Sequence, residues 1–264
     1  MNIGESAYWD ERYKIEMAKL VQFELFDWYC PFNDLWQMME GVFDPTVVHK
    51  VLIIGVGRSN VVETLYKKGF RDITAIDISN TIIMEMQKRY SDYTGVEFFV
   101  MDTKQLMKFS MDSFTLVLDK ACIDSLFCGT DYIDSTTLAM SEIYRVMKQN
   151  AVFISISHGS KLSRIPYLRT IPWAIDCYKV SSHIGEHLML YAMTKTTNQD
   201  LINRKIPGAE ATLQAKSSHV VSNLDQTMNK GSTTKSGQNT GSITVTASVD
   251  VLAEMVAESA EVDT

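Results

Sequence analysis

Residues 47–54 have the sequence VVHKVLII and run directly into residues 55–60, GVGRSN. An apolar segment that is rich in β-branched residues and ends at a glycine is typical of a buried strand in a parallel sheet. Residues 59–68 then place Val62, Leu65 and Tyr66 on one side of a predicted helix that stops at Gly69. This strand, glycine loop and helix form the first unit of a predicted α/β sheet.

The rest of the first 195 residues repeats this alternation. Further strands are predicted at 73–76, 96–100, 114–118 and 151–156, and helices at 81–90 and around Leu138, Ile143 and Val146. Strands joined by helix-length crossovers form a doubly wound parallel sheet. After Pro172, two strands at 174–180 and 187–193 are separated by a short linker that contains Gly185, as an antiparallel pair requires. We therefore expect a Rossmann-like α/β fold whose seven-stranded sheet has five parallel strands and a closing antiparallel pair.

The distribution of aromatic residues divides the chain at residue 195. All 11 Tyr, 11 Phe and 4 Trp precede residue 196, whereas residues 196–264 contain 18 Ser or Thr. The run NKGSTTKSGQNTGS (229–242) has almost nothing to bury, so it cannot offset the entropy of ordering the chain. We expect a folded domain over 1–195 and a disordered polar tail over 196–264. Within the tail, only 249–260 has apolar residues at helical spacing.

Charge and hydropathy exclude several classes of protein. Lys plus Arg number 25 and Asp plus Glu 32, which gives a net charge of −7. An acidic chain without a basic block argues against nonspecific nucleic-acid binding. No stretch approaches the roughly 20 apolar residues of a membrane-spanning helix. The N-terminus also lacks the basic start and apolar run of a secretory signal, so we expect a cytoplasmic protein.

The cysteines and histidines do not form a recognisable metal or disulfide pattern. The four cysteines show no CxxC spacing, and reduced thiols are the expected state. His183 and His187 flank Glu186 beside a predicted strand, where positions four apart face the same way but lie about 13 Å apart. We therefore expect no metal site.

Three positions decide what the first loop can bind. Gly55 and Gly57 allow the backbone to approach a ligand closely and to turn sharply into the helix. A dinucleotide fingerprint requires a third glycine at position 60, where this chain has Asn60. A pyrophosphate has less room against the helix without that glycine, so NAD is disfavoured.

Acidic residues follow the next three strands, at the edge of the sheet where ligands bind. Asp77 lies 22 residues after Gly55, where a side chain accepts hydrogen bonds from ribose hydroxyls, although a helix N-cap is also compatible with it. Asp102 is placed to accept a hydrogen bond from an adenine amino group, and Asp119 and Lys120 end the fourth strand. An adenosine ligand without a pyrophosphate site indicates S-adenosylmethionine.

Longer motifs resemble one family. They are YWDERY (8–13), FDWY (26–29), VLIIGVGRSN (51–60), GFRDITAIDIS (69–79), MDTKQL (101–106), SFTLVLDKACIDSL (113–126) and HLMLYAM (187–193). These segments are similar to the YWDxRY group of class I methyltransferases, whose best-known members methylate lysines or the N-terminus of translation elongation factor 1-alpha. The resemblance covers residues 8 to 195. It implies the class I methyltransferase fold, S-adenosylmethionine as cofactor and a protein substrate.

The resemblance also implies roles for individual residues. Trp9, Tyr13 and Trp28 match aromatic residues that close over the cofactor, and their π faces suit a sulfonium cation and an adenine ring. The remaining matches are Gly55 beside the methionine part, Asp77 and the Ile78 backbone at the ribose, Asp102 and Thr103 at the adenine, and Lys120 at the fourth strand.

Two departures from the family leave the acceptor open. Arg58 stands where the family usually has Asn, and Ala121-Cys122 stands where it usually has Gly-Thr. The sequence is also compatible with Trp9 and Trp28 as core aromatics and with Lys120 as a surface lysine.

The expected reaction is in-line transfer of a sulfonium methyl to a nitrogen, and the resemblance implies the nitrogen of a lysine. Asp119 or Asp124 would orient the incoming ammonium, although a helix cap is the simpler function for Asp124, and no general base is named. His158 either faces the acceptor or is a loop histidine without a role. The alternatives are a small-molecule methyltransferase and a catalytically silent, cofactor-binding scaffold.

Overall fold

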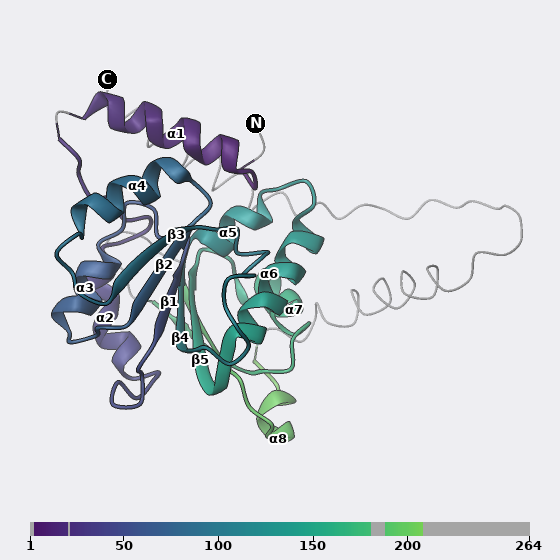
Figure 1. Ribbon diagram of the computed structural model, residues 1–264. Coiled ribbons are helices and arrows are strands. Elements are labelled where there is room, and N and C mark those ends of the chain that lie inside the picture. The colour runs from purple at the N-terminus through teal and green to yellow at the C-terminus, as the bar shows by residue number, and fades with distance from the viewer. Residues whose placement is uncertain (1–2, 21, 181–187, 208–264) are drawn as a thin grey trace, which may run out of the picture.

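The computed structural model describes residues 3–20, 22–180 and 188–207 (Figure 1). One sheet with strand order β3-β2-β1-β4-β5-β7-β6 forms its centre. The strands are β1 Val51–Ile54, β2 Ile73–Asp77, β3 Val96–Val100, β4 Phe114–Lys120, β5 Met147–Ser157, β6 Ala174–Lys179 and β7 Met189–Thr194. β1 to β5 pair in parallel, whereas β7 pairs antiparallel with both β5 and β6. The predicted class I methyltransferase fold is thereby confirmed.

Helices cover both faces of the sheet (Figure 1). They are α1 Ser6–Lys19, α2 Phe32–Glu40, α3 Val61–Lys67, α4 Asn80–Arg89, α5 Cys122–Phe127, α6 Tyr132–Val146, α7 Lys161–Leu168 and α8 Gln199–Ile202. α1 to α4 contribute to one buried apolar cluster, and α5 to α7 contribute to the other. β1 belongs to both clusters because Val51 and Ile53 face the first and Leu52 and Ile54 face the second. This two-sided burial explains why the strand is apolar at every position.

The first strand is shorter than predicted. β1 begins at Val51, and the apolar residues before it do not extend the sheet, since Val47 is 58% exposed. Leu138, which we expected on the apolar side of its helix, is 55% exposed, whereas Ile143 and Val146 of the same helix are fully buried. The predicted elements otherwise lie within a few residues of the observed ones.

The packed part of the chain extends beyond residue 195. α8 follows the last strand, and Arg204 donates hydrogen bonds to the Ile175 carbonyl and to Asp176. Ile206 is 6% exposed and joins the second apolar cluster. The folded domain therefore includes Ile206, and a boundary at Lys195 is too early. Residues 208–264, the rest of the predicted tail, lie outside the described residues. Among the described helices, none is long and apolar enough to cross a membrane.

Candidate active site

A cavity lies at the carboxyl ends of the parallel strands, between the sheet and the N-terminal residues. It encloses about 1150 Å³, including the part that is open to solvent. Every residue predicted to contact a cofactor lines this cavity: Trp9, Tyr13, Trp28, Gly55, Gly57, Asp77, Ile78, Asp102, Thr103 and Lys120. The edge of an open α/β sheet is where ligands bind in such folds, so this cavity is the candidate active site.

The glycine loop after β1 forms the floor of the cavity. Gly55 has a φ of 59° and Gly57 a φ of 50°, which only glycine adopts without strain. A Cβ atom on Gly55 would lie 2.5 Å from the Cβ of Cys122, and one on Gly57 would lie 3.0 Å from the Tyr13 hydroxyl. Both glycines are therefore required by close approach as well as by backbone conformation.

Asp77 lies at the end of β2 and is buried. Its Oδ2 accepts a hydrogen bond from the Gly57 backbone nitrogen at 2.9 Å, and its Oδ1 accepts one from Ser79 at 3.0 Å. The N-cap of α4 is Ser79, whose side chain accepts from Ile82, so Asp77 is not the helix cap. Burial raises the pKa of Asp77 to about 6. The carboxylate is thus fixed beneath the glycine loop.

The next strand end contributes Asp102 and Thr103. Asp102 accepts a hydrogen bond from the Lys104 backbone nitrogen at 2.9 Å, which fixes the turn after β3. Thr103 is buried, with its hydroxyl 3.8 Å from the Cys122 sulfur. Asp77, Ile78, Asp102 and Thr103 all line the cavity, at the ends of the neighbouring strands β2 and β3.

Lys120 is neither exposed nor free. Its Nζ lies 2.9 Å from Asp27 Oδ1 and donates to the Trp28 carbonyl at 2.8 Å, and both charged side chains are under 10% exposed. Asp27 also accepts hydrogen bonds from the Ser59 hydroxyl and the Asn60 backbone. The alternative that Lys120 is a surface lysine is therefore wrong. Lys120 attaches the segment of Asp27 and Trp28 to the end of β4. Sequence reasoning missed Asp27, although its place in the FDWY motif was a signal.

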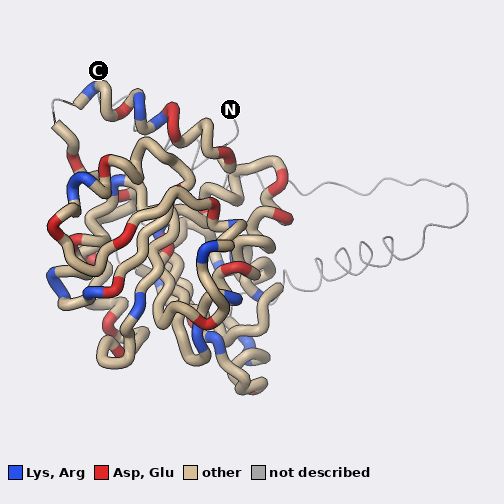
Figure 2. Tube along the Cα trace, in the orientation of Figure 1, with Lys and Arg blue, Asp and Glu red and all other residues tan. Residues whose placement is uncertain are grey.

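Helix α1 carries the two aromatic residues that cover the cavity. Trp9 and Tyr13 lie one turn apart, with ring centroids separated by 5.9 Å. The Arg12 guanidinium lies 4.9 Å from the Trp28 ring centroid and 5.7 Å from that of Trp9, so it joins α1 to the following segment. Asp10 accepts from the Thr81 nitrogen at 3.1 Å and attaches α1 to the start of α4. Both acidic and basic residues are distributed along α1 (Figure 2).

Arg58, one of the departures from the family, connects the glycine loop to this cover. Its guanidinium pairs with Glu16 of α1 at 2.9 Å and lies 5.4 Å from the Phe26 ring centroid. The backbone adds a hydrogen bond from Phe26 to the Arg58 carbonyl at 2.9 Å. Arg58 therefore contacts α1 and Phe26 in addition to lining the cavity.

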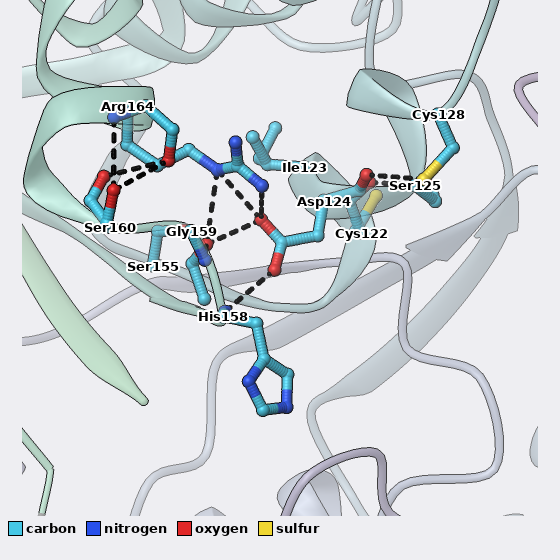
Figure 3. A network of polar contacts seen from close by, with 12 residues as sticks. Cys122, Ile123, Asp124, Ser125, Cys128, Ser155, His158, Gly159, Ser160 and Arg164 are labelled. Atoms are coloured by element: carbon cyan, nitrogen blue, oxygen red, sulfur yellow. Dashed lines mark hydrogen bonds and ion pairs between the residues drawn. The ribbon is translucent and has the colours of Figure 1, made fainter. Parts of the chain in front are cut away.

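The two aspartates considered for the acceptor differ in position. Asp119 lines the cavity, and its carboxylate accepts from the Ser155 hydroxyl at 2.6 Å and the Ile123 nitrogen at 3.2 Å. Burial, with the nearby Asp124 charge, raises the pKa of Asp119 to about 7. Asp124 is 1% exposed, outside the cavity lining, and bonded to other segments of the chain (Figure 3). Asp124 therefore neither reaches an ammonium ion in the cavity nor caps its own helix, and both predictions for it are wrong.

In the described part of the chain, no group of three or more His, Cys, Asp or Glu residues is placed to hold a metal ion. His183, Glu186 and His187 lie outside that part.

Comparisons with known proteins find methyltransferases among the sequences similar to this chain. Residues 52–155 match a family model described as a methyltransferase domain. EEF1A lysine methyltransferase 4 of Mus musculus is 27% identical over 198 residues, which cover 71% of this chain and 74% of that protein. The eEF1A lysine and N-terminal methyltransferase of Mus musculus is 30% identical over 157 residues, 58% of this chain. That match spans only 21% of the relative's length.

Solved structures share the architecture. A structure concerned with the conversion of a disulfide bond into a thioacetal group during echinomycin biosynthesis superposes with a TM-score of 0.55 at 14% sequence identity. The alignment covers 82% of this chain and 99% of that one. At this level of identity the likeness extends to the fold alone.

Proposed function

We propose that this chain, which belongs to the class I S-adenosylmethionine-dependent methyltransferases, transfers a methyl group to a lysine side chain of a protein. Elongation factor 1-alpha is the proposed acceptor. The observation that carries the proposal is one cavity that combines the glycine loop, the strand-end aspartates and the aromatic cover. The similarity to EEF1A lysine methyltransferase 4, which spans 71% of the chain, supports a protein acceptor over a small molecule.

The residues of the cavity fit the cofactor. Gly55 and Gly57 line the cavity without side chains of their own, and the buried Asp77 carboxylate accepts a hydrogen bond from the Gly57 backbone nitrogen. Asp77 would hold the ribose, Asp102 and Thr103 the adenine, and the Gly55 backbone the methionine part. When bound, S-adenosylmethionine supplies an electrophilic methyl group on a sulfonium.

Aromatic residues in the lining of the cavity affect the protonation of a lysine acceptor. Trp28, Phe26 and Phe32 line the cavity, so a lysine that enters it loses most of its hydration. Desolvation lowers the pKa of an amine and favours the neutral form that attacks a methyl group. Asp119, whose pKa is about 7, lies on the same cavity and is able to take up a proton near neutral pH. We assign the rest of the rate enhancement to alignment of the two reactants.

The thiols and the net charge bear on the compartment and the binding partners that we propose for the enzyme. Cys30, Cys122, Cys128 and Cys177 are all free, which supports a reducing, cytoplasmic compartment. The net charge of −7 argues against nonspecific binding of nucleic acid.

Labelled S-adenosylmethionine tests the proposal. The full chain is incubated with it in a cell lysate, and label is then measured separately in proteins and in small molecules. We expect label in a protein with the mass of elongation factor 1-alpha, and none when Asp77 is replaced by alanine. Label only among small molecules would support the first alternative. Calorimetric binding of S-adenosylhomocysteine without any transfer would support a silent scaffold.

A further inference from the structure

One carboxylate on α1 is shared by two arginines. Glu16 Oε1 accepts a hydrogen bond from Arg12 Nε at 2.6 Å, and Glu16 Oε2 pairs with Arg58 Nη2 at 2.9 Å. Arg12 lies one turn before Glu16 on the same helix, whereas Arg58 belongs to the glycine loop, 42 positions further along the chain. Each carboxylate oxygen thus binds a different guanidinium, and Glu16 joins α1 to the loop.

The three charged side chains are largely shielded from solvent. Their exposed fractions are 13% for Arg12, 11% for Arg58 and 25% for Glu16. Water and salt screen an ion pair in such a position less than an exposed pair. Without the carboxylate, the two guanidinium groups would lose the negative charge that they share, and an unpaired charge is costly where it is partly buried.

Both arginines contact residues that line the cavity. The Arg12 guanidinium lies 5.7 Å from the Trp9 ring centroid and 4.9 Å from that of Trp28, and both rings belong to the lining. Arg58 lines the cavity itself and lies 5.4 Å from the ring centroid of Phe26, another lining residue. The shared carboxylate is outside the lining, so it affects a ligand only through these neighbours.

α1 is also attached to the domain at a second point, six residues before Glu16. Asp10 accepts hydrogen bonds from the Ser79 hydroxyl at 2.5 Å and from the Thr81 backbone nitrogen at 3.1 Å. Tyr13 lies between the two attachments and is 6% exposed. The contacts with α4 do not involve Glu16, so loss of its charge releases α1 from the glycine loop and leaves the helix attached elsewhere.

We propose that Glu16 is a positioning residue that holds α1, with the two aromatic residues that cover the cavity, against the glycine loop through Arg12 and Arg58. By this contact Glu16 slows the release of the cofactor. The inference rests on the proposed function in one respect, that S-adenosylmethionine occupies this cavity. The family resemblance does not imply it, because the family usually has an uncharged Asn where this chain has Arg58.

Binding of S-adenosylhomocysteine to the full chain tests the inference without any methyl transfer. Glu16→Gln removes the charge but keeps the length and helix propensity of the side chain. Arg58→Gln removes the partner charge on the glycine loop, and the double variant completes a thermodynamic cycle. Affinity is measured by calorimetry, and the association and release rates by stopped-flow tryptophan fluorescence. The melting temperature of each variant is measured without ligand.

Two substitutions of the same kind provide matched controls. Glu11→Gln removes one negative charge from an exposed position on the same helix. Glu63→Gln breaks an ion pair with Lys67 on α3, and the exposed fraction of the Glu63 side chain, 27%, is close to that of Glu16. Neither glutamate lines the cavity.

We expect Glu16→Gln to raise the release rate about fivefold or more and to leave the association rate within about twofold of wild type. A cover that opens more often releases its ligand faster and does not hinder entry. The effect should be smaller in the Arg58→Gln background, where the carboxylate has one arginine fewer to hold. Both controls should bind like wild type, and Glu16→Gln should melt within a few degrees of it.

An unchanged release rate in Glu16→Gln, an equal effect in both backgrounds, or the same loss in the two controls would overturn the inference. A sharp fall in melting temperature with unchanged release would also overturn it, because Glu16 would then only stabilise the fold. A wild type that does not bind S-adenosylhomocysteine would reject the proposed function and this inference together. A wild type that binds it and transfers no methyl group would reject the proposed function alone.

Discussion

Replacing Ala121 by glycine should not destabilise the protein, although the residue is partly buried beside the cavity. Ala121 precedes α5 with a φ of 73° and a ψ of −13°, in the left-handed region. The family that this chain resembles usually has glycine at this position. We therefore expect Ala121→Gly to remove strain that the alanine Cβ causes.

The magnitude follows from three opposing effects. A left-handed conformation costs a residue with a Cβ about 1–2 kcal/mol. Glycine loses about 0.4–1 kcal/mol of this gain through the greater entropy of the unfolded chain. Losing a partly buried methyl group costs a fraction of about 0.8 kcal/mol. With mid-range values of the three effects, the expected net change in the free energy of unfolding is a gain of about 0.4 kcal/mol, close to neutral.

Ala139 provides the matched control. It lies in the interior of α6 and is fully buried, so glycine there loses helix propensity as well as apolar contact. We expect Ala139→Gly to lower the free energy of unfolding by about 2 kcal/mol.

Urea unfolding of the full chain, followed by tryptophan fluorescence without ligand, measures both variants. The two variants should differ in sign, or differ by about 2 kcal/mol if Ala121→Gly is neutral. If Ala121→Gly loses as much stability as Ala139→Gly, the strain at this position does not exist and the reasoning is refuted.

Three further predictions concern the cover, the buried acid and the tail. Trp9→Ala should weaken S-adenosylmethionine binding by about 1–2 kcal/mol in calorimetry, the scale of a partly desolvated cation–π contact. An unchanged affinity would remove Trp9 from the site. The raised pKa of Asp119, about 7, means that the folded state holds a proton which the unfolded state releases near pH 4, so apo stability should fall as pH rises from 4 to 7. Asp119→Asn should flatten that dependence in melting temperature, and an identical pH profile would contradict it. A chain that ends at residue 207 should melt within a few degrees of the full chain, whereas one that ends at Lys195 should melt lower because it lacks Ile206.

Much of the fold was predictable because buried parallel strands are mostly apolar. VLII (51–54) is apolar throughout, and ITAID (73–77) is apolar except for Thr74 and the terminal Asp77. α2 was not predicted, although it buries Phe32, Leu35, Trp36 and Met39, and the helical spacing of these residues was a usable signal. α7 was not predicted either, and Pro166 inside it argues against a helix.

The site was predictable where its residues follow strand ends, and unpredictable where it depends on tertiary contact. Asp77, Asp102 and Lys120 were found by position because parallel strands end at one edge. The burial of Lys120 against Asp27 and the hydrogen bonds of Asp124 join residues up to 95 positions apart in the sequence. No periodicity links such residues, so these contacts emerge only when the chain is folded.

Mass spectrometry of recombinant elongation factor 1-alpha tests the central claim most directly. The protein is incubated with the full chain and S-adenosylmethionine, and then digested and sequenced by fragmentation. The account predicts added methyl groups on a lysine side chain with the wild-type enzyme and none with Asp77→Ala. An unmodified acceptor, from an enzyme that calorimetry shows to bind S-adenosylmethionine, would contradict the proposed acceptor.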